Sequence, residues 1–506
     1  LDKKIGKTLT LGLKTGFGYT YSNLLSGATA GSTLTGAGSI LRSMVTTRPF
    51  MNSQAELDDD PDDDNVRYGP NRWLQESKNN SKRFRITPSF YIQWRIIPSL
   101  TFKSIIGGDF RSSLNVKTKS AKLTPTTGTI AGLGKSTSFM YNWDNLLTFR
   151  ESFGKHKVNI TLGQSLSRTS SSVENVQGWF LPNQYAEETA INFADGDYSS
   201  FTYTESGNSL LSFFTRAIYN YDDRYVLTAT CRLDGSSRFK GKNKWSTFPS
   251  FAFAWRLSNE PWFNVPVISA AKLRFGWGLV GNQAIGNYQT MTTFTTGSVG
   301  NQYSESQAST SIFPGNIANP DLKWETTQQF NLGFDLSLWQ GRLTMTLDAY
   351  SKDTYDLLQN KVVAYSTGFQ TIAMNDGSIR NQGIELSVDA VPVSLGSFEW
   401  SIRGNIAFNR NRILNVGASG DSGEIYLAPG DKRQVNYFTG EKLQSSGNIS
   451  PLNIFVEGQP MGLFYGFIVD GIVQENETGP GFSPGETRGP GYIKYADLNG
   501  NGYIDD

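Results

Sequence analysis

The residues of this chain that could carry out chemistry are few and lie far apart in the sequence. His156 is the single histidine and Cys231 the single cysteine among 506 residues. A histidine-based triad needs its base beside a nucleophile, and zinc needs several Cys or His ligands; neither arrangement occurs. Cys231 falls on the apolar side of an alternating pattern, which is typical of a small packing or lipid-facing residue. These residues predict that the protein is not an enzyme.

One short segment near the end of the chain has the spacing of a cation-binding loop. Asp497, Asn499 and Asn501 occupy alternate positions, Gly502 follows, and Asp505 comes three residues later. This is the pattern of the first half of an EF-hand calcium loop, in which side-chain oxygens converge around a tight glycine turn. However, no helical pattern precedes it, so a tight Asn/Gly turn in a surface loop is the alternative. We predict no cofactor, with Ca²⁺ at this loop as the one exception.

The elements that must position any site are β-strands, because the dominant pattern is alternation of apolar and polar residues. From Gln329 to Leu338 every second residue is apolar, and the alternation resumes from Leu343 to Tyr350 after the tight link Trp339 to Gly341. The same pattern predicts thirteen strands, at 8–22, 82–96, 100–114, 139–151, 157–170, 209–221, 224–235, 247–258, 272–281, 326–338, 342–356, 379–391 and 398–413.

The links between these strands alternate between short and long. Short links such as 97–99, 152–156 and 222–223 are followed by long ones such as 115–138 and 171–208. An outer-membrane barrel has short turns at one end and long loops at the other, whereas a soluble sandwich has no such asymmetry. The sequence therefore predicts an all-β, antiparallel, up-and-down transmembrane barrel. Tyr and Trp residues beside the short links suit the aromatic belts of such barrels.

Composition agrees with this class of protein. The 46 Lys and Arg against 45 Asp and Glu leave a net charge of +1, which argues against a nucleic-acid partner. No run of about 18 apolar residues is present to form a membrane helix. The first residues carry no signal-peptide pattern and no initiator Met, so we expect both ends to be cuts within a longer protein.

In a barrel, the polar side of each strand faces the lumen. The charged residues on that side include both signs, which suits a lumen that holds a plug domain better than a simple pore. As substrate-binding candidates we take Arg85, Arg111, Arg216, Arg232, Asp348, Glu385 and Arg403. The acidic run 58–64 lies in the first long loop, and a solvated loop tip is the simplest interpretation of it.

Several segments resemble the SusC/RagA family of TonB-dependent transporters. They occur in the family's order and are dense from about residue 205 onward: FFTRAIYNYDDRY at 213–225, DGSSRF at 234–239, LRFGWG at 273–278, NPDLKWETT at 319–327, NQGIE at 381–385, GQPMGLFYG at 458–466 and YADLNGNG at 495–502. Residues 1–204 fit the strand pattern but carry fewer of these signatures.

The resemblance implies a barrel of about 22 strands in the outer membrane of Bacteroidetes-type Gram-negative bacteria, of which about 13 lie in this chain. It also implies energy from TonB, a SusD-like surface lipoprotein as partner, and a glycan or peptide as the imported nutrient. We expect residues 1–413 to form barrel strands in contact with outer-membrane lipid. Residues 414–506 are expected to form a long extracellular loop region with its own short hairpins, for example at 462–473.

Two other functions stay open from the residues alone. A passive porin or surface-binding barrel would need neither a lid nor energy coupling, and the family segments argue against it. A barrel enzyme would need a histidine or paired carboxylates on the long-loop side. His156 lies in a short turn on the other side, which argues against this function.

Overall fold

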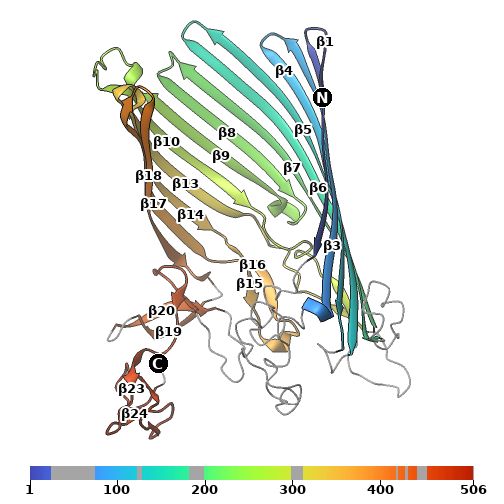
Figure 1. Ribbon diagram of the computed structural model, residues 1–506, viewed down its shortest axis with the longest axis vertical. Helices are drawn as coiled ribbons and strands as arrows, with labels where there is room; N and C mark the ends of the chain where they lie inside the picture. The colour runs from blue at the N-terminus through green and yellow to red at the C-terminus, as the bar shows by residue number, and fades with distance from the viewer. Residues whose placement is uncertain are drawn as a thin grey trace. The chain divides into compact units, whose positions relative to one another are not determined.

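The computed structural model describes residues 1–23, 74–121, 128–181, 199–297, 311–417, 420–427, 431–440 and 453–504. Fourteen of its strands form one antiparallel sheet in which neighbours follow chain order, β1-β2-β3-β4-β5-β6-β7-β8-β9-β10-β13-β14-β17-β18 (Figure 1). Because each strand of this sheet pairs with the strand of the sheet that follows it in the chain, the up-and-down, all-β prediction is confirmed. No helix in the described ranges is both long and apolar enough to cross a membrane.

All thirteen predicted strands are present, but their ends differ from the prediction, by ten or eleven residues at one end of β5, β6 and β7. They are β2 (Leu9–Asn23), β3 (Ser77–Ile97), β4 (Leu100–Lys119), β5 (Thr129–Phe153), β6 (His156–Leu181), β7 (Ser199–Tyr221), β8 (Tyr225–Ser236), β9 (Trp245–Arg256), β10 (Ile268–Asn282), β13 (Glu325–Leu338), β14 (Leu343–Tyr355), β17 (Ser378–Leu395) and β18 (Phe398–Asn415).

Two differences from the predicted strands have clear causes. The sheet also contains β1 (Asp2–Ile5), which has the sequence DKKI and therefore no apolar alternation to reveal it. Several strands run further toward the long loops than predicted, and β6 reaches Leu181 instead of residue 170. A strand needs alternating apolar and polar residues only where one of its faces meets lipid and the other does not. We attribute the missed extensions to segments in which both faces meet water and the alternation is lost.

Smaller sheets lie outside the main one. β11 (Phe294–Gly297) pairs with β12 (Ser311–Pro314), and β15 (Leu358–Val362) pairs with β16 (Thr371–Asn375). The remaining small strands are β19 (Asp421–Tyr426), β20 (Lys432–Thr439), β21 (Asn453–Val456), β22 (Leu463–Phe464), β23 (Val469–Ile472), β24 (Gly479–Pro480), β25 (Thr487–Arg488) and β26 (Ile493–Tyr495).

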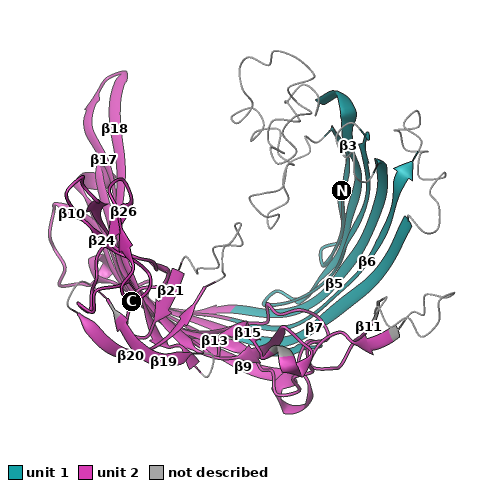
Figure 2. Cartoon of the chain, turned by 90° about the horizontal axis from the view of Figure 1, so that it is seen from below, with its two compact units in different colours: residues 1–150, 160–215, 234–237 teal, residues 151–159, 216–233, 238–506 magenta. Residues whose placement is uncertain are grey.

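The predicted hairpin at 462–473 is wrong, because β22 pairs with β21 and β23 pairs with β26. The assignment of 1–413 to barrel strands and 414–506 to an extracellular loop stays a prediction. By compactness the chain divides into two units (Figure 2). Unit 1 contains residues 1–150, 160–215 and 234–237, and unit 2 contains residues 151–159, 216–233 and 238–506.

The two faces of the sheet differ sharply, as unit 2 shows. Cross-strand neighbours place Phe275, Leu332, Ala349, Ile384 and Phe408 in one row across β10, β13, β14, β17 and β18. The side chains of Leu332, Ile384 and Phe408 are 52%, 53% and 67% exposed. A water-soluble protein does not expose a contiguous apolar row of this kind, whereas lipid covers it in a membrane barrel. Alternation alone left the burial of this face undecided; its exposure favours lipid contact.

A charge placed on this apolar face should destabilise the protein. Leu347 is 45% exposed on the lipid side of β14, and Thr346 lies beside it on the opposite face at the same depth. In the complete protein containing this chain, Leu347→Arg is expected to lower the free energy of unfolding by about 2–4 kcal/mol. Thr346→Arg, the matched control, should change it much less. Urea unfolding in lipid vesicles measures both, and equal losses would contradict the assignment of faces.

Candidate functional site

A row of charged residues crosses the polar face of unit 2, one position along from the apolar row. Arg274 on β10, Gly333 on β13, Asp348 on β14 and Glu385 on β17 are successive cross-strand partners. Period-two alternation fixes this arrangement, since a shift of one residue would exchange the two faces. Two of the predicted candidates, Asp348 and Glu385, are thus brought side by side on neighbouring strands.

Arg274 is the centre of this row. Its guanidinium donates to both carboxylate oxygens of Asp335, at 2.9 and 2.8 Å, and forms an ion pair with Asp348 at 2.9 Å. Lys272 donates to the same Asp335 at 3.2 Å. Two cations and two carboxylates therefore neutralise one another within a single network. Such pairing offsets the cost of holding charges next to a low-dielectric membrane interior.

Gly333 makes the reach from Arg274 to Asp348 possible. The strand that carries Gly333 lies between the other two, so the guanidinium must cross it. A Cβ atom on Gly333 would lie 2.5 Å from Asp348 Oδ1 and 2.6 Å from Arg274 Cζ. Real Cβ contacts are not that short, so any side chain here would push the ion pair apart. The absence of a side chain at Gly333 is therefore what allows the Arg274–Asp348 ion pair to form.

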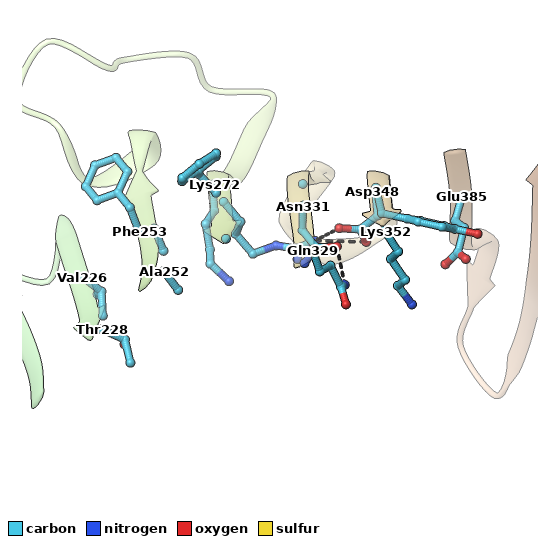
Figure 3. Close-up of a pocket in the computed structure, with 16 residues that line it drawn as sticks. Val226, Thr228, Ala252, Phe253, Lys272, Gln329, Asn331, Asp348, Lys352 and Glu385 are labelled. Atoms are coloured by element: carbon cyan, nitrogen blue, oxygen red, sulfur yellow. Dashed lines mark hydrogen bonds and ion pairs between the residues drawn. The ribbon is translucent and has the colours of Figure 1, made fainter. Parts of the chain in front are cut away.

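A cavity of about 550 Å³ lies along this row (Figure 3). That volume is within the usual range for small-ligand pockets. Figure 3 shows Gln329, Lys352 and Glu385 extending from one side of the strands, while Phe253 extends from the other. The lining residues are Val226, Thr228, Ala252, Phe253, Ala254, Lys272, Arg274, Phe275, Gly276, Gln329, Asn331, Gly333, Asp348, Tyr350, Lys352 and Glu385.

Most of these lining residues were not among the sequence-based candidates. Gln329, Asn331, Tyr350 and Lys352 were missed, although they share the parity of Asp348 and Glu385 on their strands. A signal was available, since every second residue from Gln329 and from Asp348 must face the same way. The sequence does not give the register between neighbouring strands. It therefore could not show which of these positions lie side by side.

Two other predicted candidates meet in unit 1. Arg85 on β3 and Arg111 on β4 are direct cross-strand partners. Both bind Asp109, with Nη2 to Oδ2 distances of 2.8 Å from Arg85 and 2.5 Å from Arg111. Two guanidinium groups on one carboxylate leave an excess positive charge at this place on the polar face.

The last three candidates are not brought into the cavity. Arg403 pairs with Asp389 at 2.6 Å on the neighbouring strand, and its side chain is 88% exposed. Arg216 on β7 is exposed and Arg232 on β8 is half-buried. Neither lines the cavity. The substrate-binding role of all seven candidates stays a prediction.

The Asp497 loop is held by its own hydrogen bonds. The carboxylate of Asp497 accepts from the backbone N–H groups of Gly500 and Gly502, both at 2.7 Å. The side chain of Asn499 accepts from Asn501 N–H at 2.9 Å. The described ranges hold no group of three or more His, Cys, Asp or Glu placed to bind a metal ion. Asp505 and the acidic run 58–64 lie outside the described residues, so calcium binding stays a prediction.

Residues 319–327, one of the segments that resemble the family, stabilise the loops at the long-loop end of the sheet. Trp324 is buried, with its ring centroid 5.4 Å from those of Phe239 and Phe248. Its indole N–H donates to Lys244 O at 3.2 Å. Asn319 donates to Ala373 O at 2.9 Å. These contacts hold the surrounding loops in place and give the segment a structural role.

At the short-turn end, aromatic and charged groups lie together in unit 2. The rings of Tyr221, Tyr225 and Trp255 form a stacked series, with successive centroids 6.4 and 6.2 Å apart. Trp262 continues it and is 65% exposed. This is the expected composition of an interfacial aromatic belt. His156 Nδ1 lies 2.7 Å from the hydroxyl of Tyr219, within this belt.

The charges of these turns pair across neighbouring turns. Lys155 binds Asp222 at 2.9 Å, and Lys157 binds Asp223 at 2.7 Å. These lysines hold the pKa of each aspartate below its ordinary value. Glu260 receives hydrogen bonds from Tyr225 and Trp255 and a further one from Arg224, and these lower its pKa as well.

Exposed apolar strands, a polar face of paired charges and an aromatic belt define a β-barrel of the outer membrane. The family model described as "TonB dependent receptor-like, beta-barrel" matches residues 4–503. The chain therefore belongs to the TonB-dependent receptor family, in the β-barrel region of its members, and is an outer-membrane protein. The family identification made from sequence segments is confirmed.

Individual relatives agree with this assignment. The chain is 30% identical over 443 residues to TonB-dependent receptor SusC of Bacteroides thetaiotaomicron, covering 85% of this chain and 40% of that protein. It is 28% identical over 453 residues to TonB-dependent receptor P39 of Formosa agariphila, covering 87% and 40%. The chain thus spans about two-fifths of the length of these curated relatives.

Among solved structures, the fold is similar to that of the RagAB peptide importer in its "open-open" state. The TM-score is 0.74 with 20% sequence identity, and the match covers 98% of this chain and 52% of the other. At this identity the likeness concerns the fold. The predicted barrel class is confirmed by it.

The role of Gly333 can be tested by adding one methyl group. Gly333→Ala is expected to lower the free energy of unfolding of the complete protein by about 1 kcal/mol, because the new Cβ overlaps the Arg274–Asp348 pair. Gly276→Ala is the matched control, since its Cβ would come no closer than 3.9 Å to any neighbour. In an Asp348→Ala background, which removes the carboxylate and frees Arg274 to turn toward Asp335, the cost of Gly333→Ala should shrink. An unchanged cost there would show that the ion pair is not what the methyl group disturbs.

The paired carboxylates at the short turns should make the stability of the protein depend on pH. Asp222, Asp223 and Glu260 have lowered pKa values in the folded protein. Their contribution is therefore present above their unfolded pKa values of about 4 and is lost as pH falls through and below that range. Unfolding measured between pH 7 and pH 3 should show this loss. The double variant Asp222→Asn/Asp223→Asn should flatten the curve, and a curve of unchanged slope would contradict the assignment.

Proposed function

We propose that the complete protein containing this chain imports a nutrient across the outer membrane, driven by TonB. The observation that supports this most is the polar face of the sheet, where paired charges surround a ligand-sized cavity in a member of the TonB-dependent receptor family. The apolar opposite face would hold this wall in lipid, and the cavity would contact a solute passing through the lumen.

The partners of this import follow from the family resemblance. Coupling to TonB would occur through a part of the complete protein outside this chain. The resemblance to SusC-type transporters favours a SusD-like lipoprotein that covers the long-loop side. The nutrient would be a glycan or a peptide, and one similar structure is described as a peptide importer. Binding of Ca²⁺ by Asp497, Asn499, Asn501 and Asp505 would rigidify the loop that carries them, and it is proposed as a secondary feature.

A passive porin or surface-binding barrel is the alternative, and energy dependence separates it from import. Cells carrying the complete gene should deplete one class of solute from a medium of mixed oligosaccharides and peptides, as measured by mass spectrometry. Deletion of the gene and loss of TonB should each abolish that depletion. Depletion that survives loss of TonB would sink the import proposal and favour a porin. Cleavage products accumulating outside intact cells would instead indicate an enzyme.

A further inference from the structure

The apolar face of unit 2 ends in arginines on the long-loop side. Ile384 and Phe408 are cross-strand partners in the apolar row, and Arg410 follows two residues further along β18. Two residues beyond it, Arg412 is the direct cross-strand partner of Arg380 on β17. Because side chains alternate between the two faces of a strand, all three arginines share the face of Ile384 and Phe408. Together they are the lipid-face arginine cluster.

The depth of this cluster follows from the length of the apolar run on β18. From Phe398 to Phe408 no position on the apolar face carries a charge, and these two end residues are 62% and 67% exposed. The ten steps from residue 398 to residue 408, at about 3.3 Å each on a strand tilted by about 40°, cross about 25 Å of membrane. The apolar band of outer-membrane barrels is about 25 Å tall. Arg410 and Arg412 therefore lie where the lipid headgroups begin.

The cluster holds all the Lys and Arg residues on the apolar face of four neighbouring strands. In β13, β14, β17 and β18, which the structure describes completely, the other cations are Lys352 and Arg403. Both have the opposite parity and lie on the polar face. Asp353 is the one carboxylate on the apolar face of these strands. Positive charge on the lipid side is thus concentrated at a single depth.

That carboxylate is already engaged within the protein. Nε and Nη2 of Arg380 each donate to one oxygen of Asp353, both at 2.6 Å. Three guanidinium groups and one carboxylate leave a charge of 3 − 1 = +2 on the cluster. Arg412 lies directly opposite Arg380, and like charges in that arrangement destabilise a sheet. Arg410 and Arg412 are both exposed, so an anion from outside these strands can reach them.

The spacing of the two exposed arginines suits a phosphate group. Residues two apart on one strand lie about 6.6 Å apart, and the long side chains of Arg410 and Arg412 can converge on one anion across that distance. Guanidinium groups bind phosphate oxygens in a bidentate manner. The exposed ring of Phe408, two residues toward the middle of the membrane, offers an apolar contact beside them. A phosphate next to an acyl chain is the chemistry of an anionic lipid.

We propose that the lipid-face arginine cluster binds the phosphate of an anionic lipid in the leaflet on the long-loop side. The phosphate oxygens accept hydrogen bonds from Arg410 and Arg412, Arg380 stays with Asp353, and an acyl chain lies along Phe408. A solute in the lumen is not the occupant, because the cluster lies on the opposite face of the sheet. The site is independent of the proposed import, and a bound lipid would fix the depth of β17 and β18 in the membrane.

Binding of defined lipids to the purified complete protein in a non-ionic detergent tests this. Native mass spectrometry would compare dioleoyl phosphatidic acid with dioleoyl phosphatidylcholine, which has the same acyl chains and no net charge. Phosphatidic acid is expected to bind at least tenfold more tightly. Arg410→Gln and Arg412→Gln should each weaken its binding about tenfold, because each removes a charge-assisted hydrogen bond. Neither should change the binding of phosphatidylcholine. Arg412→Lys keeps the charge without the bidentate geometry and should cause a smaller loss.

Lys14→Gln and Lys103→Gln are the matched controls, since each removes one positive charge from the polar face, on β2 and β4. They should leave the binding of phosphatidic acid unchanged, and heat-dependent electrophoretic mobility confirms that every variant is folded. Equal affinity for the two lipids, or equal losses in the control and cluster variants, would overturn the inference. An unchanged affinity in Arg410→Gln would do so too, because another segment of the complete protein would then occupy the cluster. Displacement of phosphatidic acid by an equal concentration of inorganic phosphate would indicate a site for soluble anions instead of lipid.

Discussion

The structure depends on one constraint, which is that backbone N–H and C=O groups inside a bilayer must find partners within the protein. Long antiparallel strands meet it, and pairing of each strand with its chain neighbour gives a continuous ladder of fourteen strands. Every strand then has one face toward lipid and one away from it. The apolar row through Leu332, Ile384 and Phe408 and the charged row one position along are two consequences of the same backbone arrangement.

Charges on the inner face bring a second requirement, because each lies close to a low-dielectric layer. Arg274 meets it by reaching two carboxylates on two strands, and Gly333 permits the longer reach.

The two ends of the strands serve different purposes. At the short turns, stacked aromatic rings and the Lys155–Asp222 and Lys157–Asp223 pairs suit a position where lipid headgroups meet water. At the long-loop end, Trp324 packs on Phe239 and Phe248 and anchors segments far apart in the sequence. Anchored loops beside a charged wall suit the import that we propose for the complete protein.

The sequence by itself determined thirteen of the fourteen strands of the main sheet and their up-and-down order, because alternation and turn residues are local signals. It also determined the family, through the segments that resemble it. It also placed Asp348 and Glu385 on the polar side. Only the tertiary structure decided that the apolar face is exposed, since period-two alternation is the same for a soluble sheet and a membrane sheet. The register between strands decided which residues lie side by side. It paired Lys352 with Gln329 and Arg274 with Gly333, and no local sequence pattern encodes such pairings.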